Sequence, residues 1–444
     1  MARKHAIVMG ASMAGLMATR ALSDHFERVT VIEQDTLPEA PENRRGVPQG
    51  RHTHGLLAGG RQEMERVFPG VTREMVDAGA LAGDIVRDFR WFFEGGCLAQ
   101  VASGMDAVAA SRPFIESFIR RRAFGLKNVT SRQACQVEGL LATEDRGRVS
   151  GVRVDGETLA ADLVVDATGR GSKMPQWLKD LGYEAAEEER VEISLKYTTR
   201  YFRRDARELG GDLGTVTPPT AAGKRGGVMI AQEGGRWTVT LICHFGPHAP
   251  EDLAGFIAWA GTLPAPYIHE VIRKAEPLGD ATQAGMPASV RRRYEKLARF
   301  PEGLLVTGDA VCSFNPIYGQ GMTVAAQYGR ELNEALAEGE QDLARRFFAR
   351  AARAADNPWT IAVGNDLRMP ETVGPRNAGV NAVNWYMSKL HRAAHTDAEL
   401  ALAFHRVANL LAPPPSVMQP RLALRVLGSG LFGGGEKARA AGAR

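Results

Sequence analysis

The sequence predicts a mixed α/β fold with a helical C-terminal region. Residues 6–33 have the pattern of a strand, a glycine turn, a helix and a second strand, which is the βαβ unit of a parallel sheet. From about 192 to 293 the pattern changes to strand-like stretches separated by Gly and Pro turns, which is typical of an antiparallel sheet. The apolar run at 303–310 returns to the parallel type. We therefore expect the antiparallel sheet to be an insertion into the parallel one.

The same patterns divide the chain into three parts. One part is discontinuous and comprises residues 1–190 and 296–370, the inserted sheet takes 191–295, and the helical region takes 371–444. The last residues, GGGEKARAAGAR, are small or charged, and we expect them to be frayed. Within these parts we expect helices at 12–23, 56–68, 112–126 and 252–262, strands at 29–33, 134–142, 149–154 and 163–167, and a long helix from Gly321.

Composition and charge exclude several classes of protein. The chain has 444 residues, of which 44% are hydrophobic and 24% are charged, as in a soluble enzyme with a sizeable core. Its net charge of +4 is too small and too evenly spread to predict nucleic-acid binding. The four cysteines lie far apart without a C-x-x-C pair, which favours reduced thiols and a cytoplasmic location. No apolar run reaches the roughly 18 residues of a membrane span, so we expect no transmembrane segment.

The basic and then apolar N-terminus is also compatible with a secretory signal peptide. Here a second strand ending in Glu33 follows the apolar run, and no clean cleavage site introduces a mature domain. We therefore favour the βαβ unit.

Two histidine pairs suggest a metal site, but neither has the pattern of one. His391 and His395 stand four apart on a predicted helix, yet Arg392 occupies the position where zinc proteases carry glutamate. His244 and His248 are separated by a Gly-Pro turn, so no helix presents them together. We predict no metal site.

The first glycine turn, Gly10-Ala11-Ser12-Met13-Ala14-Gly15, has the spacing G-x-G-x-x-G with serine at the middle glycine. Gly10 permits the tight turn, a small residue at Ser12 lets the backbone approach a pyrophosphate, and Gly15 lets the helix pack close to the strand. The helix N-terminus supplies free N–H groups and a partial positive charge. An acidic residue at position 33 can accept hydrogen bonds from a ribose. These features predict a Rossmann-like dinucleotide site formed by Gly10, Ser12, Met13, Ala14, Gly15, Glu33 and Gln34.

Two further turns combine glycine with an acidic residue. In LLVTGDAVCSFNPIYGQGMTVA, residues 304–325, Asp309 is placed to bond sugar-alcohol hydroxyls, and the glycines after it free the backbone to approach a flat ring. In ADLVVDATGRGS, residues 161–172, Asp166 and Gly169 follow a buried strand. The three turns together fit a ligand with a diphosphate, a ribityl chain and an aromatic ring, namely FAD.

Over nearly its whole length the chain resembles the FAD-dependent monooxygenases of the para-hydroxybenzoate hydroxylase fold. The three turns carry the resemblance to the fold. A further similarity, to the bacterial squalene-epoxidase-like epoxidases of polyether biosynthesis, lies in the stretches RRGVPQGRHTHGLLAGG, DATGRGS, GGRWTVTL and LLAPPPSVMQPRLALRVL.

The resemblance implies FAD as the cofactor and assigns its contacts. Arg112 would approach the diphosphate or ribityl region, Asp309 would bond the ribityl chain, and residues 316–322 would border the pyrimidine edge of the ring. The family also lays a loop along the flavin, at positions that match part of RRGVPQGRHTHGLLAGG. The residues implied beyond the first turn are Gln49, Arg51, His52, His54, Arg112, Val137, Asp166, Gly169, Asp309, Pro316, Gly319, Gly321 and Met322.

The resemblance implies the reaction as well. In this family the reduced flavin and O2 form a C4a-hydroperoxide, which transfers one oxygen atom to an electron-rich carbon. We therefore expect epoxidation or hydroxylation of an apolar alkene or aromatic natural product, and we predict no catalytic side chain. Several aromatic residues are able to form a pocket wall, although core packing is the favoured interpretation for those in the inserted sheet. These are Tyr197, Tyr201, Trp237, Phe202 and Phe245, and the further wall candidates are Phe314, Tyr318 and Trp91.

Electrons for this reaction would come from NAD(P)H. The NADPH-using hydroxylases carry Asp-Gly in the turn after the LVV strand, whereas Thr168-Gly169 stands there in this chain. Direct NAD(P)H binding and supply through a separate flavin reductase therefore both remain open.

Other functions share these motifs. A reductase of the geranylgeranyl-reductase type also carries DATGRGS and saturates double bonds. A flavin-dependent halogenase needs a lysine and usually a W-x-W-x-I-P segment, whereas GGRWTVTLIC has one tryptophan and no such segment. A non-catalytic FAD-binding protein is a third alternative. The apolar spacing of RLALRVLGSGLF suits either a membrane contact or packing against the FAD-binding part.

Overall fold

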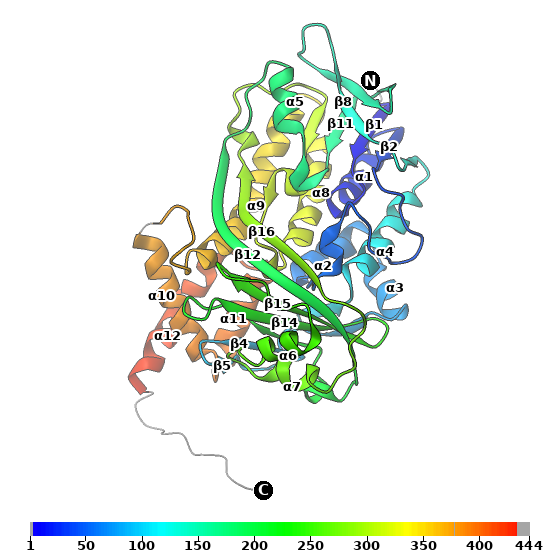
Figure 1. Cartoon of the computed structure of the whole chain (residues 1–444). Coiled ribbons are helices and arrows are strands. Elements are labelled where there is room, and N and C mark those ends of the chain that lie inside the picture. The colour runs from blue at the N-terminus through cyan, green and yellow to red at the C-terminus, as the bar shows by residue number, and fades with distance from the viewer. Residues whose placement is uncertain (1–2, 377, 433–444) are drawn as a thin grey trace.

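The computed structural model describes residues 3–376 and 378–432, so the tail GGGEKARAAGAR lies outside the described residues. Figure 1 shows a parallel sheet in the upper part of the molecule and an antiparallel sheet in the lower part, with the long strands β12 (Glu188–Arg203) and β16 (Thr282–Arg292) running between them. The C-terminal helices α10 (Ala378–Ala393), α11 (Ala398–Ala408) and α12 (Pro420–Phe432) lie beside the lower part. The predicted mixed α/β fold is confirmed.

The parallel sheet has five strands in the order β17-β11-β1-β2-β7, so the N-terminal apolar run is its central strand. Helix α1 (Met13–Ser23) packs on helix α8 (Gly321–Ala337) so closely that a Cβ on Gly329 would lie 2.8 Å from Cβ of Met17. The predicted βαβ unit is therefore present. The strands are β1 (His5–Met9), β2 (Arg28–Ile32), β7 (Val129–Arg132), β11 (Leu163–Asp166) and β17 (Leu304–Val306).

A small antiparallel sheet, β10-β9-β8, lies at the edge of this part. Its strand β8 begins at Val137 rather than at the predicted residue 134. The reason is that Ala134 and Cys135 donate their N–H groups to the backbone oxygens of Asp35 and Glu33 and so extend the end of β2. The strands are β8 (Val137–Ala142), β9 (Val149–Val154) and β10 (Glu157–Ala160).

The large sheet has eight strands in the order β18-β16-β12-β15-β14-β13-β4-β5. The sheet includes strands that lie outside the predicted inserted segment, residues 191–295. Strand β4 pairs in parallel with β13, and strand β18 pairs with β16. The segment FRWFFEGGC, which contains β4 and β5, has apolar residues on both strand faces and no alternation, so periodicity gave no signal for it. The remaining strands are β4 (Phe89–Phe93), β5 (Gly96–Cys97), β13 (Gly214–Thr217), β14 (Arg225–Gln232), β15 (Arg236–His244) and β18 (Cys312–Ser313), with the separate pair β3 (Leu81–Asp84) and β6 (Asp106–Ala109).

Helices α6 and α7 pack on one face of the large sheet, and the C-terminal helices pack beside the end formed by β4 and β5. The short helix α7 was not predicted from the sequence. The segment RLALRVLGSGLF lies in α12, and its buried residues Leu422 and Val426 pack with α10 and α11 rather than with the FAD-binding part. None of the described helices is long and apolar enough to cross a membrane. The remaining helices are α2 (Ala58–Val67), α3 (Val71–Asp77), α4 (Arg112–Phe124), α5 (Met174–Asp180), α6 (Leu253–Ala260), α7 (Tyr267–Ile272) and α9 (Leu343–Asp366).

Candidate functional site

The three glycine turns meet at the carboxyl ends of β1, β11 and β17. A Cβ on Gly308 (φ +65°) would lie 2.4 Å from Cβ of Ala14, which joins the second turn to the first. A Cβ on Gly169 would lie 4.0 Å from Cβ of Asp309, which joins the third turn to the second. This edge is where open α/β sheets bind their ligands. The structure therefore brings together segments that lie far apart in the sequence.

In the first turn, α1 starts close to the strand before it. A Cβ on Gly15 would lie 1.8 Å from the backbone oxygen of Gly10, so only glycine fits there. No side chain caps the N-terminus of α1. The Ser12 hydroxyl instead accepts a hydrogen bond from Nη2 of Arg112 at 2.9 Å, while Met13 is buried in the core. The free N–H groups and the Arg112 guanidinium give this turn a positive electrostatic character.

The carboxylate of Glu33 lies at the end of β2 and closes this turn. It accepts hydrogen bonds from the N–H of Ala11 at 2.8 Å and of Asp35 at 3.1 Å. It also pairs with Nη1 of Arg44 at 3.1 Å, and Arg44 further pairs with Asp35 and Glu116. Arg44 is buried and its Nη2 has no hydrogen-bond partner among the described residues. Sequence reasoning missed this residue, although it opens the stretch RRGVPQG; Gln34, by contrast, is exposed.

The two acidic turns differ in how they use their carboxylates. The Asp166 carboxylate is fully buried and accepts hydrogen bonds from the N–H and hydroxyl of Thr168 and from the Ser172 hydroxyl. The Asp166 side chain therefore organises the third turn, and a cofactor contact by this residue stays a prediction. The Asp309 carboxylate makes no hydrogen bond with any residue that the structure describes, and burial raises its pKa against the opposing effect of Arg170.

The segment after Asp309 forms a short helical turn, Pro316–Tyr318, and then opens α8 at Gly321. A Cβ on Gly321 would meet no atom within 4 Å, so the backbone there is accessible. The Met322 side chain, in contrast, is buried in the core, which leaves only its backbone for contact with a ligand. Val137 lies outside this group, at the start of β8.

The loop at 51–55 is held between the large sheet and the start of α8. Nδ1 of His52 lies 2.8 Å from the Thr199 hydroxyl, and the Thr53 N–H donates to the Thr240 hydroxyl at 3.2 Å. On the other side, a Cβ on Gly319 would lie 3.4 Å from the backbone oxygen of Gly55. Burial lowers the pKa of His52 to about 4 and the pKa of His54 to about 3. Both imidazoles are therefore neutral at physiological pH, while Arg51 is exposed.

The amino-acid sequence matches a known family and a known protein. Residues 3–347 match the model of the FAD binding domain. The chain belongs to this FAD-binding family, of the para-hydroxybenzoate hydroxylase type. It is 35% identical over 433 residues to protein Rv3254 of Mycobacterium tuberculosis, with 92% of this chain and 90% of that protein covered.

Solved structures show the same fold. The flavin-dependent brominase Bmp2 superimposes with a TM-score of 0.66 at 16% identity, over 96% of this chain and 98% of its own. PqsL, a probable FAD-dependent monooxygenase from Pseudomonas aeruginosa, superimposes with a TM-score of 0.59 at 16% identity, over 89% of this chain and 99% of its own.

The residues at the three turns fit FAD. Glycines that no side chain can replace bring α1 against β1, and two buried guanidinium atoms, Nη2 of Arg44 and Nε of Arg112, have no partner among the described residues. The carboxylate of Asp309 is similarly unbonded within the described chain. Buried polar groups of this kind normally find partners, so donors and an acceptor are available here for a polar dinucleotide.

The predicted pocket aromatics fall on both faces of the large sheet. The Tyr197 ring packs edge-on against His52 at 4.5 Å, and the Tyr201 hydroxyl donates to the backbone oxygen of Arg51 at 3.3 Å. The Tyr318 hydroxyl bonds Asp366, and Phe314 packs near Trp359. Trp237 and Phe202 have the core packing that the sequence favoured for them, because both are fully buried on the opposite face, in the cluster that packs on α6 and α7, where Nε1 of Trp237 donates to Glu208. Phe245 is partly exposed.

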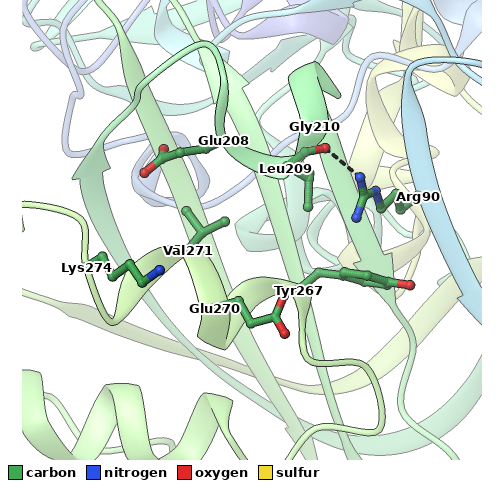
Figure 2. A pocket seen from close by; sticks show the side chains of 8 residues that line it. All are labelled: Arg90, Glu208, Leu209, Gly210, Tyr267, Glu270, Val271 and Lys274. Carbon is green, nitrogen blue, oxygen red and sulfur yellow. Dashed lines mark hydrogen bonds between the residues drawn. The ribbon is translucent and has the colours of Figure 1, made fainter. Parts of the chain in front are cut away.

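A cavity of about 310 Å³ also lies on that opposite face. Figure 2 shows the side chains that line it. Nη2 of Arg90 donates to the backbone oxygen of Leu209 at 2.7 Å, and its guanidinium lies 4.9 Å from the centre of the Tyr267 ring. Because Arg90 and Trp91 are neighbours on β4, their side chains point to opposite faces of the sheet. This cavity is therefore separated by the sheet from the loop at 51–55. Its residues are Arg90, Glu208, Leu209, Gly210, Tyr267, Glu270, Val271 and Lys274.

Proposed function

We propose that this protein is an FAD-dependent monooxygenase that inserts one oxygen atom of O2 into an apolar alkene or aromatic substrate, by epoxidation or hydroxylation. The observation that carries the proposal is the loop at 51–55, which joins the sheet to the start of α8 at the edge where the three glycine turns meet. A flat ring held at that edge would face the large sheet across this loop. The family match supports the cofactor.

In this proposal the chain holds FAD at three places. The N-terminus of α1 and Arg112 bind the diphosphate, because both are positively polarised there. Glu33 and Asp309 accept hydrogen bonds from the ribose and ribityl hydroxyls. The backbone from Gly319 to Met322 borders the ring. Gln34, just after β2, and Val137, at the start of β8, are further proposed contacts of the cofactor. When bound, FAD supplies the redox chemistry and the reaction with O2.

The remaining work of the chain is to exclude water and to orient the substrate. The neutral rings of His52 and His54 and the Tyr197 ring put little charge beside the reacting carbon. This environment favours an apolar substrate, since a charged one would lose its hydration without compensation. Oxygen transfer to an electron-rich carbon requires no acid/base pair.

The proposal includes NAD(P)H as the source of electrons, either directly or through a separate flavin reductase. The turn Asp166–Gly169 supports the reductase, because Thr168 bonds the buried Asp166 and so is committed to the turn.

The decisive experiment is product analysis under ¹⁸O2. Purified protein is loaded with FAD, supplied with NAD(P)H and a flavin reductase, and offered lipophilic alkenes and aromatics. The proposal requires a yellow protein and a product that carries one ¹⁸O atom. A saturated product would instead indicate an ene reductase of the geranylgeranyl-reductase type, and a halide-dependent product would indicate a halogenase. A colourless protein that does not bind FAD would contradict all three.

A further inference from the structure

Two buried histidines in the C-terminal region have ring nitrogens without a hydrogen-bond partner in the part of the chain that the structure describes. His391 on α10 is 2% exposed and His405 on α11 is 0% exposed. None of their four ring nitrogens has a partner among the described residues. The other buried histidines, His5, His52 and His244, each bond a neighbouring atom. Because buried polar groups normally find partners, His391 and His405 are exceptions among the buried histidines that the structure describes.

Aromatic rings surround the two imidazoles. The His391 ring lies 4.5 Å from Phe93 and 4.7 Å from Phe404, measured between ring centres. The His405 ring lies 5.0 Å from Trp91 and 5.2 Å from Phe404. Trp91, Phe93 and Phe404 are all partly exposed. The histidines are therefore one aromatic layer below an accessible surface.

Trp91 connects this aromatic group to the loop at 51–55. The register places Trp91 beside Val216, Val216 beside Val228, and Val228 beside Thr240. Directly paired residues share one face of a sheet, so these four side chains form a row, which we call the sheet row. At its far end the Thr240 hydroxyl accepts the N–H of Thr53. The row spans three strand spacings, roughly 14 Å.

The middle of the sheet row is apolar and accessible. Val216 and Val228 lie in inner strands, yet both remain partly exposed, whereas Val239 and Leu241 on the other face are fully buried. A second connection runs through α11, where Asn409 donates to the backbone oxygen of His405 and accepts from the N–H of Ala58 just after the loop. The histidines and the loop thus belong to one continuous face.

The charges near the two histidines are already compensated. Glu94 pairs with Arg368 and Arg392, and the Asp84 carboxylate accepts several hydrogen bonds, including those from Ser103. Burial lowers the pKa of both His391 and His405 to about 3, so each ring offers one N–H donor and one acceptor nitrogen at neutral pH. A neutral hydroxyl or carbonyl group matches these donors and acceptors, whereas a charged group would lack a counter-ion.

We propose that His391 and His405 bind a neutral hydroxyl or carbonyl group of the substrate, whose apolar body lies along the sheet row from Trp91 towards Thr53. This inference rests on the proposed function, because it assumes that the substrate reacts beside the loop. In this proposal the two histidines determine substrate specificity at a distance from the reacting carbon. The substrate is then an elongated apolar molecule with one neutral polar end.

The test uses the FAD-loaded full chain and two probes, 2-naphthol and naphthalene, which differ only in the hydroxyl group. Imidazole ¹⁵N signals are assigned with H391F and H405F and followed during titration. We expect 2-naphthol, but not naphthalene, to shift the ¹⁵N signals of His391 or His405. Calorimetry should show that replacing both histidines lowers the preference for 2-naphthol over naphthalene by roughly three- to tenfold, as for the loss of one or two hydrogen bonds. The matched control is H269F, on α7 beyond the opposite face.

The variants also separate binding from a structural role. Because the ring nitrogens have no partners, H391F and H405F should keep or raise the Tm, whereas a lower Tm would show that the histidines hold the fold. H405Q retains a donor and an acceptor and should keep part of the hydroxyl preference. An unchanged preference in the double Phe variant, or unmoved ¹⁵N signals, would overturn the proposal. None of these measurements requires catalytic turnover. A negative result in the ¹⁸O2 experiment would contradict the proposed reaction, whereas a negative result here would contradict only the proposed binding by His391 and His405.

Discussion

The Tyr318 hydroxyl donates a hydrogen bond of 2.8 Å to Oδ1 of Asp366. Nδ2 of Asn315 donates to the same oxygen at 2.7 Å, so one carboxyl at the end of α9 holds both ends of the turn that precedes α8. Oδ2 of Asp366 is buried without a partner among the described residues. Sequence reasoning missed Asp366, since the segment IAVGNDLRM that contains it has no recognisable motif.

This carboxyl makes stability depend on pH. Burial raises the pKa of Asp366 to about 7, although the hydrogen bonds from Tyr318 and Asn315 oppose the rise. The folded state therefore holds the proton more tightly than the unfolded state, whose carboxyl has a pKa near 3.9. Its contribution to stability is complete below that value and is lost as the pH rises towards 7. Between pH 4 and pH 8 the wild type should lose a few kcal/mol of unfolding free energy through Asp366, whereas D366N should not, because asparagine does not titrate. D366N should therefore become more stable relative to the wild type as the pH rises. A difference that stays constant over this range would contradict the assignment.

The contact between the first and second turns should not tolerate a methyl group. G308A would place Cβ 2.4 Å from Cβ of Ala14 at a backbone φ of +65°. We expect a loss of about 1–3 kcal/mol in stability and weaker FAD binding, measured by denaturation and flavin titration. The matched control is G171A in the third turn, where a Cβ meets no atom within 4 Å. Equal FAD affinity in G308A and G171A would show that the turns do not enclose the cofactor.

Arg112 is expected to contribute directly to FAD affinity. Its Nη2 bonds Ser12 and its Nε is buried without a partner among the described residues. Because charge-assisted hydrogen bonds to phosphate are strong, R112A should raise the Kd for FAD roughly ten- to a hundredfold, whereas R112K should lose less. R121A, from the exposed side of the same helix, serves as the control. An unchanged Kd in R112A would place the diphosphate elsewhere.

Arg44 forms ion pairs with three carboxylates. It lies about 3 Å from Glu33, Asp35 and Glu116, and it is itself buried. Removing a buried partner leaves charges uncompensated, so R44A should lose about 3–5 kcal/mol of unfolding free energy in a denaturant titration. The double variant R44A/E116A should recover part of this loss. If the two variants are equally unstable, the carboxylates do not depend on Arg44.

The local parts of the fold were predictable and the long-range parts were not. The βαβ unit and the glycine turns follow from spacing within about thirty residues, so 6–33 and 303–310 were correctly interpreted. The face of Trp237 was not predictable, because its strand alternates Thr and apolar residues and only the observed packing shows that the apolar side faces α6 and α7. The ion pairs of Arg44 and the bond from Tyr318 to Asp366 join positions that no single-sequence pattern connects.

The pairing of strand β4 with β13 affects how the chain folds. Residues 89–91 pair in parallel with 214–216, so the sheet cannot be completed until more than a hundred intervening residues have been made. Such late closure predicts slow folding. A fragment restricted to 191–295 would expose the unpaired edge of β13 and would be prone to self-association. Expression of the inserted sheet alone is therefore expected to yield aggregates, and the smallest autonomous unit must begin before β4.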